Sequence, residues 1–157
     1  MGMNPKIIPD RVGQPAVEYF PEAATQSFVA GEVVYNNSGL APNTTARAGA
    51  NLGIVQQAAS GTTSTPLAVE LFRPGMIIEC STTNAGTAAA ASGFTAGTRY
   101  GWYVASNVHE ADLNATGTTD KTHCLIFLAQ VPPRAGQTSY RGRFLIHGSG
   151  CAGSEDA

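Results

Sequence analysis

Charged residues are scarce in this chain, and their scarcity limits what the protein can bind. Only 13% of its 157 residues are Asp, Glu, Lys or Arg, against about 25% in a typical soluble domain. The formal net charge is -2, and no segment concentrates Lys and Arg, so the sequence lacks the basic surface that attracts nucleic acid. We therefore expect no nucleic-acid partner and a surface rich in neutral polar groups.

Long apolar runs and cysteines are also few. No stretch approaches the roughly 18 apolar residues that cross a bilayer, and the first residues lack the apolar core of a secretory signal. We expect no membrane contact and no standard export. The three cysteines, Cys80, Cys124 and Cys151, are odd in number and far apart, which makes a poor disulfide framework. They are expected to be reduced thiols in one domain that has enough core without disulfides.

The sequence marks of common catalytic and metal sites are missing as well. No GxxxxGK[ST], GxGxxG, CxxC or HExxH pattern occurs, which removes the usual evidence for phosphate cradles, dinucleotide binding and zinc. The adjacent His123 and Cys124 would point to opposite faces of a strand, so they would not grip one ion. Ser149 lacks the strand-turn-helix setting of a nucleophile elbow. The sequence predicts no catalytic residue, no metal and no cofactor.

Three glutamates in strand-like runs, Glu32, Glu70 and Glu79, are the remaining candidates for acid chemistry. Paired carboxylates perform general acid and base catalysis in glycosidases when the fold holds them at a suitable separation. Sequence alone does not place them at such a separation. We expect these glutamates at solvent-facing strand positions.

What the chain does have is a series of short, β-rich apolar runs broken by Gly, Asn, Ser, Thr or Pro. Runs of this length and composition are typical of paired strands. They predict an all-β fold, a small β-barrel or β-sandwich. Strands are expected over residues 28–35, 52–58, 67–72, 76–82, 100–105, 123–131 and 140–147.

Local signals refine this prediction. Asn36-Asn37-Ser38-Gly39 tolerates left-handed turn geometry and predicts a hairpin. The strongly apolar run 123–131 predicts a strand buried on both faces. Ser106 or Asn107 is expected to cap a single helical turn over residues 108–113.

We expect a single β domain over residues 25–147, flanked by segments of different character. Residues 1–24 are rich in proline, which excludes a helix and predicts an extended N-terminal arm. Residues 84–97 consist almost entirely of Ala, Gly, Ser and Thr and predict one long ordered loop. Residues 148–157 are small and polar and are expected to form a flexible tail.

Two sets of residues follow from this division. The arm carries apolar groups that would gain from lying on the parent domain or on a neighbouring molecule. The candidate contact residues of the arm are Pro5, Ile7, Ile8, Val12, Val17, Tyr19 and Phe20. The core should instead depend on large apolar groups within the strands, above all the single Trp. The expected core anchors are Phe28, Val33, Leu71, Trp102 and Phe127.

Three successive runs resemble a known family. The runs FVAGEVVY at 28–35, LGIV at 52–55 and PLAVELFRPGMIIE at 66–79 are similar, in this order, to the head decoration (capsid cement) proteins of tailed phages. The resemblance implies a small β-barrel or β-sandwich that binds the outer surface of the assembled capsid. It further implies a homotrimer that contacts the major capsid protein, without enzymatic activity, made in the host cytoplasm and located in the virion. The arm residues then become candidate capsid contacts.

Two other classes remain open. A receptor- or glycan-binding component of the virion or tail would use a similar β-barrel, and exposed aromatic rings at Tyr100, Trp102 and Tyr140 would favour it. A trimeric nucleotide hydrolase of the dUTPase type also fits the size and the β content. That family needs an aromatic residue in its glycine-rich tail, and residues 148–157 contain none.

Overall fold

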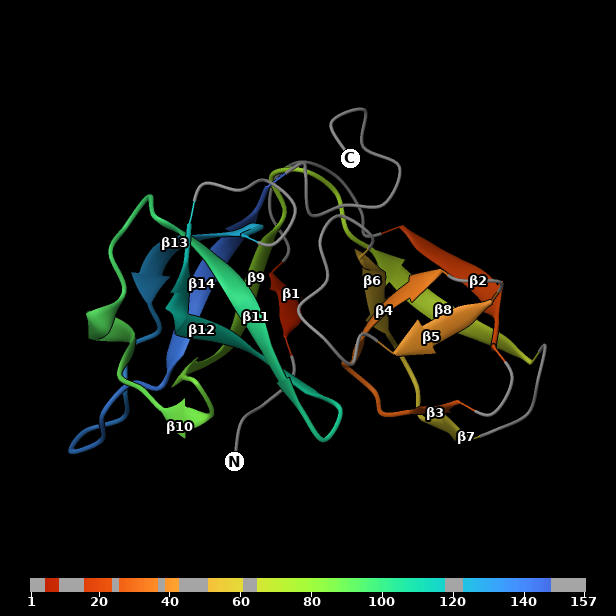
Figure 1. Cartoon of the computed structure of the whole chain (residues 1–157), viewed down its shortest axis with the longest axis horizontal. Coiled ribbons are helices and arrows are strands. Elements are labelled where there is room, and N and C mark those ends of the chain that lie inside the picture. The colour runs from red at the N-terminus through yellow and green to blue at the C-terminus, as the bar shows by residue number, and fades with distance from the viewer. Residues whose placement is uncertain are drawn as a thin grey trace.

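The computed structural model of this protein is nearly all β, which confirms the predicted fold class. The strands form a seven-stranded sheet, a five-stranded sheet and a two-stranded ribbon (Figure 1). The only helical element of the described residues is a short 3-10 turn, η1 (Ala91–Gly93). The structure describes residues 5–8, 16–23, 26–36, 39–42, 51–60, 65–117 and 123–147.

Five strands of the larger sheet close on themselves into a small barrel. They are β9 (Ile77–Asn84), β11 (Arg99–Ala105), β12 (Val108–Thr116), β13 (Leu125–Gln130) and β14 (Arg141–Ile146). β9 pairs with β14 in antiparallel and with β12 in parallel orientation, and the pairs β12–β11, β11–β13 and β13–β14 complete the ring. Two short strands, β1 (Lys6–Ile8) and β10 (Thr87–Ala88), also pair with β9.

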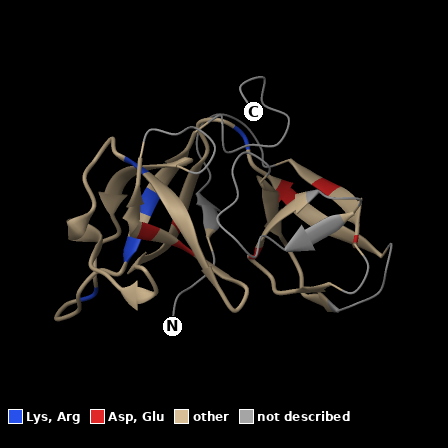
Figure 2. Cartoon of the chain, in the orientation of Figure 1, with Lys and Arg blue, Asp and Glu red and all other residues tan. Residues whose placement is uncertain are grey.

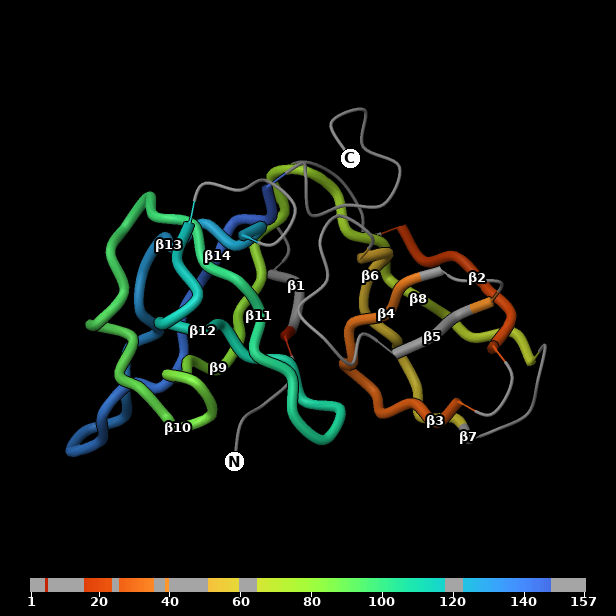
Figure 3. Tube along the Cα trace, viewed as in Figure 1, coloured from red at the N-terminus to blue at the C-terminus, as the bar shows by residue number. Residues whose placement is uncertain are grey.

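The five-stranded sheet is antiparallel throughout, in the order β2-β8-β6-β4-β5. Its strands are β2 (Val17–Pro21), β4 (Val33–Asn36), β5 (Leu40–Pro42), β6 (Asn51–Val55) and β8 (Pro66–Leu71). The β4–β5 pair confirms the hairpin predicted around residues 36–39. The ribbon pairs β3 (Ser27–Phe28) with β7 (Ala59–Ser60). Figure 3 shows that the chain, after β1, completes this sheet before it forms the five strands of the barrel.

Two hydrophobic clusters hold these sheets together, where the sequence favoured one compact core. The larger cluster takes buried residues from all five barrel strands and includes Trp102. Phe94, just after η1, packs its ring 4.5 Å from that of Tyr100, measured between centroids, and also contacts the Phe127 and Phe144 rings. The smaller cluster joins the five-stranded sheet to the ribbon. Its buried members are Phe28, Val34, Val55, Leu67 and Val69.

The five-stranded sheet contacts both clusters, one on each face. Val33 and Ile54 lie opposite each other on β4 and β6 and belong to the larger cluster. The next residues along the same strands, Val34 and Val55, belong to the smaller cluster. Neighbouring strand residues point to opposite faces, so this central sheet links the ribbon to the barrel.

Two predictions fail where turns interrupt or join strands. The run 28–35 is broken because the Glu32 N–H donates to the Val29 carbonyl at 3.1 Å and Gly31 adopts a φ of 88°. The helical turn predicted over 108–113 is wrong. Ser106 and Asn107 have φ values of 50° and 64°, the geometry of a two-residue hairpin turn, so β12 runs through this segment as a strand.

Two further predictions are corrected by burial and by local pairing. β13 is not buried on both faces, because Leu128 is 40% exposed. The segment 84–97 is more than a loop. Ala85 and Gly86, with φ values of 48° and 91°, turn β9 into β10, and η1 follows.

The proline-rich segment expected as a separate arm contributes strands to both sheets. β1 pairs with β9, and β2 pairs along its whole length with β8, from Val17 opposite Glu70 to Pro21 opposite Pro66. The main-chain groups of 17–21 that face β8 find their partners there, so the five-stranded sheet begins at residue 17 and not at 25. The tail at 148–157 lies outside the described residues.

Candidate interaction surface

The five-stranded sheet ends at an exposed edge. Among the described strands, β2 has a partner on one side only, which leaves the main-chain groups of its other side available to another strand. Val17 and Tyr19 are 46% and 70% exposed and, being two residues apart, lie on one face of the strand. Glu18 between them is exposed as well. An open edge beside exposed apolar groups is the arrangement that strand addition uses.

This edge narrows the set of candidate contacts in the arm. Phe20 is half-buried and packs against the smaller cluster, and Pro5 is buried. Val17 and Tyr19 are therefore the arm candidates whose side chains the structure shows to be exposed. The remaining candidates have side chains outside the described part of the structure: Ile7, Ile8 and Val12.

The expected core anchors lie in the two clusters. Phe28, Val33, Trp102 and Phe127 are buried. Leu71 is half-buried and packs against the smaller cluster. These side chains hold the sheets together from inside and cannot contact another protein.

Charge is divided unevenly between the two sheets (Figure 2). The described residues of the five-stranded sheet, its turns and its ribbon include no Lys or Arg, whereas arginines lie on β11 and β14 of the barrel. The glutamates of the five-stranded part are Glu18, Glu22, Glu32 and Glu70. Of these only Glu18, on β2 itself, is exposed, so a partner at the β2 edge would meet one negative charge, which would favour a basic group on the partner.

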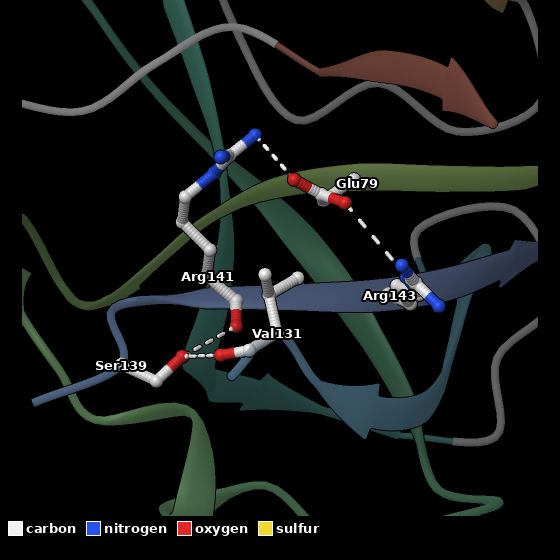
Figure 4. A network of polar contacts seen from close by, with 5 residues as sticks. All are labelled: Glu79, Val131, Ser139, Arg141 and Arg143. Atoms are coloured by element: carbon white, nitrogen blue, oxygen red, sulfur yellow. Dashed lines mark hydrogen bonds and ion pairs between the residues drawn. The ribbon is translucent and has the colours of Figure 1, made fainter. Parts of the chain in front are cut away.

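A buried carboxylate joins β9 to β14 in the barrel (Figure 4). Glu79 Oε1 lies 2.5 Å from Arg141 Nη2, and Glu79 Oε2 lies 3.7 Å from Arg143 Nε. At the start of β14, the Ser139 hydroxyl donates to the Val131 carbonyl and, at 3.0 Å, to the Arg141 carbonyl. Because Glu79 is matched by two guanidinium groups across a strand pair, its role is to hold the register of β9 and β14.

The prediction that the strand glutamates face solvent is wrong for Glu32 and Glu79, which are buried. Glu70 is half-buried and accepts a hydrogen bond from Gln56 Nε2 at 3.2 Å. Burial raises the pKa of Glu70, and the Gln56 hydrogen bond opposes this shift. Burial raises the pKa of Glu32 to about 7, while the Val29 N–H lowers it. Sequence reasoning missed Glu32 because it assigned to a strand a residue that lies in a turn.

One histidine and two cysteines are buried in the part of the chain that the structure describes. Across the described ranges, no three His, Cys, Asp or Glu side chains are grouped so that they could hold a metal ion. His109 is buried edge to face against Trp102, with ring centroids 5.9 Å apart. Cys80 and Cys124 are buried thiols outside any disulfide, and burial raises the pKa of Cys80 far above its usual range. Ser149 and Cys151 lie outside the described residues.

The aromatic residues that would favour glycan binding do not form an exposed group. Tyr100 and Trp102 are buried, and of these three candidates only Tyr140 is exposed. The described residues contain no helix long and apolar enough to pass through a bilayer. No protein-family model matches this chain, and no curated protein matches it either.

Proposed function

We propose that this protein is a viral structural protein that decorates the outer surface of a tailed-phage capsid. In this role it binds the major capsid protein as a homotrimer and stabilises the shell, without catalysis. The proposal starts from the resemblance of three runs, residues 28–35, 52–55 and 66–79, to the capsid cement proteins. Its structural support is that these runs supply β3, β4, β6, β8 and the start of β9, of which β4, β6 and β8 are neighbours in the five-stranded sheet.

The observation that carries the proposal is the open edge of β2. A strand or loop of the capsid protein that pairs with this edge would gain main-chain hydrogen bonds, and Val17 and Tyr19 would add apolar contact. Each contact is modest, but many copies act on one shell. A protein that binds only the mature shell stabilises that state by about 2.7 kcal/mol per site at a hundredfold excess over Kd.

Capsid decoration is preferred over a receptor- or glycan-binding role because of the aromatic residues. Glycan sites use exposed rings as stacking surfaces. The burial of Tyr100 and Trp102 removes two of the three rings that the sequence offered for this purpose.

The experiment is binding to undecorated, expanded capsids assembled from the major capsid protein of the same genome. Deleting residues 1–20 would remove most of β2 and would not be a clean test, so the variant is Val17→Thr with Tyr19→Thr, which keeps β-propensity. Leu128→Thr, at an exposed position on the barrel, is the matched control.

Cosedimentation and cryo-electron microscopy should show regular decoration by the wild-type protein and by the Leu128 variant. The double variant should bind at least about tenfold more weakly, since it loses the apolar contact. Failure of the wild-type protein to bind such capsids would reject the proposed function. Unchanged binding by the double variant would reject the β2 edge as the contact.

A further inference from the structure

The carboxyl group of Glu32 is fully buried in a tight turn, a feature that capsid binding does not explain. Its Oε2 accepts the Val29 N–H at 3.1 Å, while its Oε1 has no hydrogen-bond partner among the described residues. The side chain is 0% exposed. A buried carboxyl with one unmatched oxygen is tolerable when neutral and very costly when ionised.

This turn fastens the ribbon to the five-stranded sheet. The Glu32 N–H donates to the Val29 carbonyl at 3.1 Å, which closes the turn between β3 and β4. The Gly31 N–H donates to the Val55 carbonyl at 2.8 Å, and the Val55 N–H donates to the Glu32 carbonyl at 3.0 Å, which ties the turn to the end of β6. Phe28, the residue before the turn, is buried in the smaller cluster. Opening the turn would therefore release β3 and expose this apolar ring.

Among the residues that the structure describes, no opposite charge lies in the strands that surround Glu32. The described residues around it in the five-stranded sheet and ribbon include no Lys or Arg. Burial is the main cause that raises the pKa of Glu32, only the Val29 N–H opposes it, and no charged neighbour contributes. The titratable groups of these strands and of the residue that follows β2 are Glu18, Tyr19, Glu22, Tyr35 and Glu70.

We propose that Glu32 is a protonation-controlled latch. In this mechanism the neutral carboxyl keeps the Val29–Glu32 turn closed on β6, and its ionisation favours an open turn in which water reaches the carboxylate. The β3–β7 ribbon then separates from the sheet and Phe28 becomes exposed, while the barrel stays folded. The latch does not depend on capsid binding.

The test is native-state hydrogen exchange, measured by NMR on the full chain between pH 5 and pH 8 and corrected for the intrinsic exchange rate. The reporters are the amides of Val29, Gly31, Glu32 and Val55, which all take part in the closed turn. With a pKa of about 7 for Glu32 in the closed state and the ordinary value of 4.5 in the open state, their protection should fall by about 50- to 100-fold over this range. The fall should level off above pH 7.

Two variants and one internal reference make the result specific. Glu32→Gln keeps an oxygen for the Val29 N–H but does not ionise, so its protection should be independent of pH. Glu18→Gln, which removes an exposed carboxyl from β2, should keep the wild-type pH dependence. The amides of Thr82 and Phe127, which are hydrogen-bonded in the barrel, should keep their protection in all three proteins.

Three results would overturn the latch. They are pH-independent protection of the turn in the wild-type protein, the wild-type pH dependence in Glu32→Gln, and equal loss of protection in the barrel. If Glu32→Gln does not fold, the carbon-13 shift of the Glu32 carboxyl in the wild-type protein decides the matter. A midpoint near pH 7 supports the latch, and one near 4.5 refutes it.

Discussion

Replacing Glu32 by Gln should make the protein more stable at neutral and alkaline pH, and the gain should grow as the pH rises. Glutamine has nearly the same shape, and its side-chain oxygen still accepts the Val29 N–H that Glu32 Oε2 accepts now. The substitution therefore removes the cost of a buried charge while it preserves the turn. Few core substitutions of a buried polar group are expected to stabilise a protein, so the direction of the effect is informative.

The magnitude follows from the pKa of Glu32, which burial raises from 4.5 to about 7. The folded state binds the proton more tightly than the unfolded state, so stability falls as the pH rises from about 4.5 through 7 and then levels off. A shift of this size corresponds to about 3 kcal/mol at pH 8, and to about 1 kcal/mol at pH 5. These values are upper limits, because local opening of the turn relieves part of the cost.

Urea unfolding of the wild-type protein, Glu32→Gln and the control Glu18→Gln at pH 5, 6.5 and 8 provides the assay. In the wild-type protein and in Glu18→Gln, ionisation of Glu32 should lower the free energy of unfolding by about 2 kcal/mol between pH 5 and pH 8. Glu32→Gln should not show that loss. Parallel pH profiles for Glu32→Gln and the wild-type protein would refute the reasoning, since they would mean that Glu32 ionises at no cost to the folded state.

Three further predictions test the packing. In Gly53→Ala the new Cβ would clash with the Glu70 carbonyl oxygen. The midpoint of urea unfolding should therefore fall by the equivalent of about 1–3 kcal/mol. An unchanged midpoint would contradict the close approach of β6 and β8. Phe94→Ala should lower stability by about 3–5 kcal/mol, seen in thermal unfolding, unless the ring contributes nothing to the larger cluster. Iodoacetamide should modify Cys80, whose pKa burial raises, at least about a hundredfold more slowly in the native than in the unfolded protein, and rapid native labelling detected by mass spectrometry would disprove its burial.

Local sequence signals were sufficient for several strands but not for their partners. The runs that become β6, β8, β9, β11 and β14 combine β-branched and aromatic residues with clear turn signals, and each is confirmed. The closure of the barrel depends on the parallel pairing of β9 with β12, where Thr82 lies opposite Ala111. Such a pair is distant in sequence and leaves no local mark, so the sequence predicted the fold class and left barrel and sandwich undecided.

Several of the failed predictions share one physical cause, the left-handed conformation of turn residues. Gly31 splits the FVAGEVVY run into two strands, and it thereby places Glu32 in a buried turn. Ser106 and Asn107 adopt positive φ values and make a hairpin, although the same residue types are also good helix caps. The choice between these outcomes is made by tertiary pairing, here the pairing of β11 with β12.

The same dependence explains why the β2 edge was hidden from sequence analysis. The prolines of the first 24 residues indicate extended chain, and extended chain is equally suited to a free arm and to an edge strand. Pairing with β8 decides between them, and it also determines which side chains are exposed, because it buries Phe20 against the smaller cluster and leaves Val17 and Tyr19 in solvent.

The barrel and the five-stranded sheet differ in their physical properties. The barrel is closed, takes its core from five strands and matches its buried Glu79 with two arginines. The five-stranded sheet has an open edge at β2 and an unmatched buried carboxyl at Glu32. Regions that bind or move must come from the less stable part of a protein. Because β2 and the Glu32 turn are linked through β8 and β6, a partner that requires the ordered sheet would also favour the closed turn, and by reciprocity the proton on Glu32 would favour that partner.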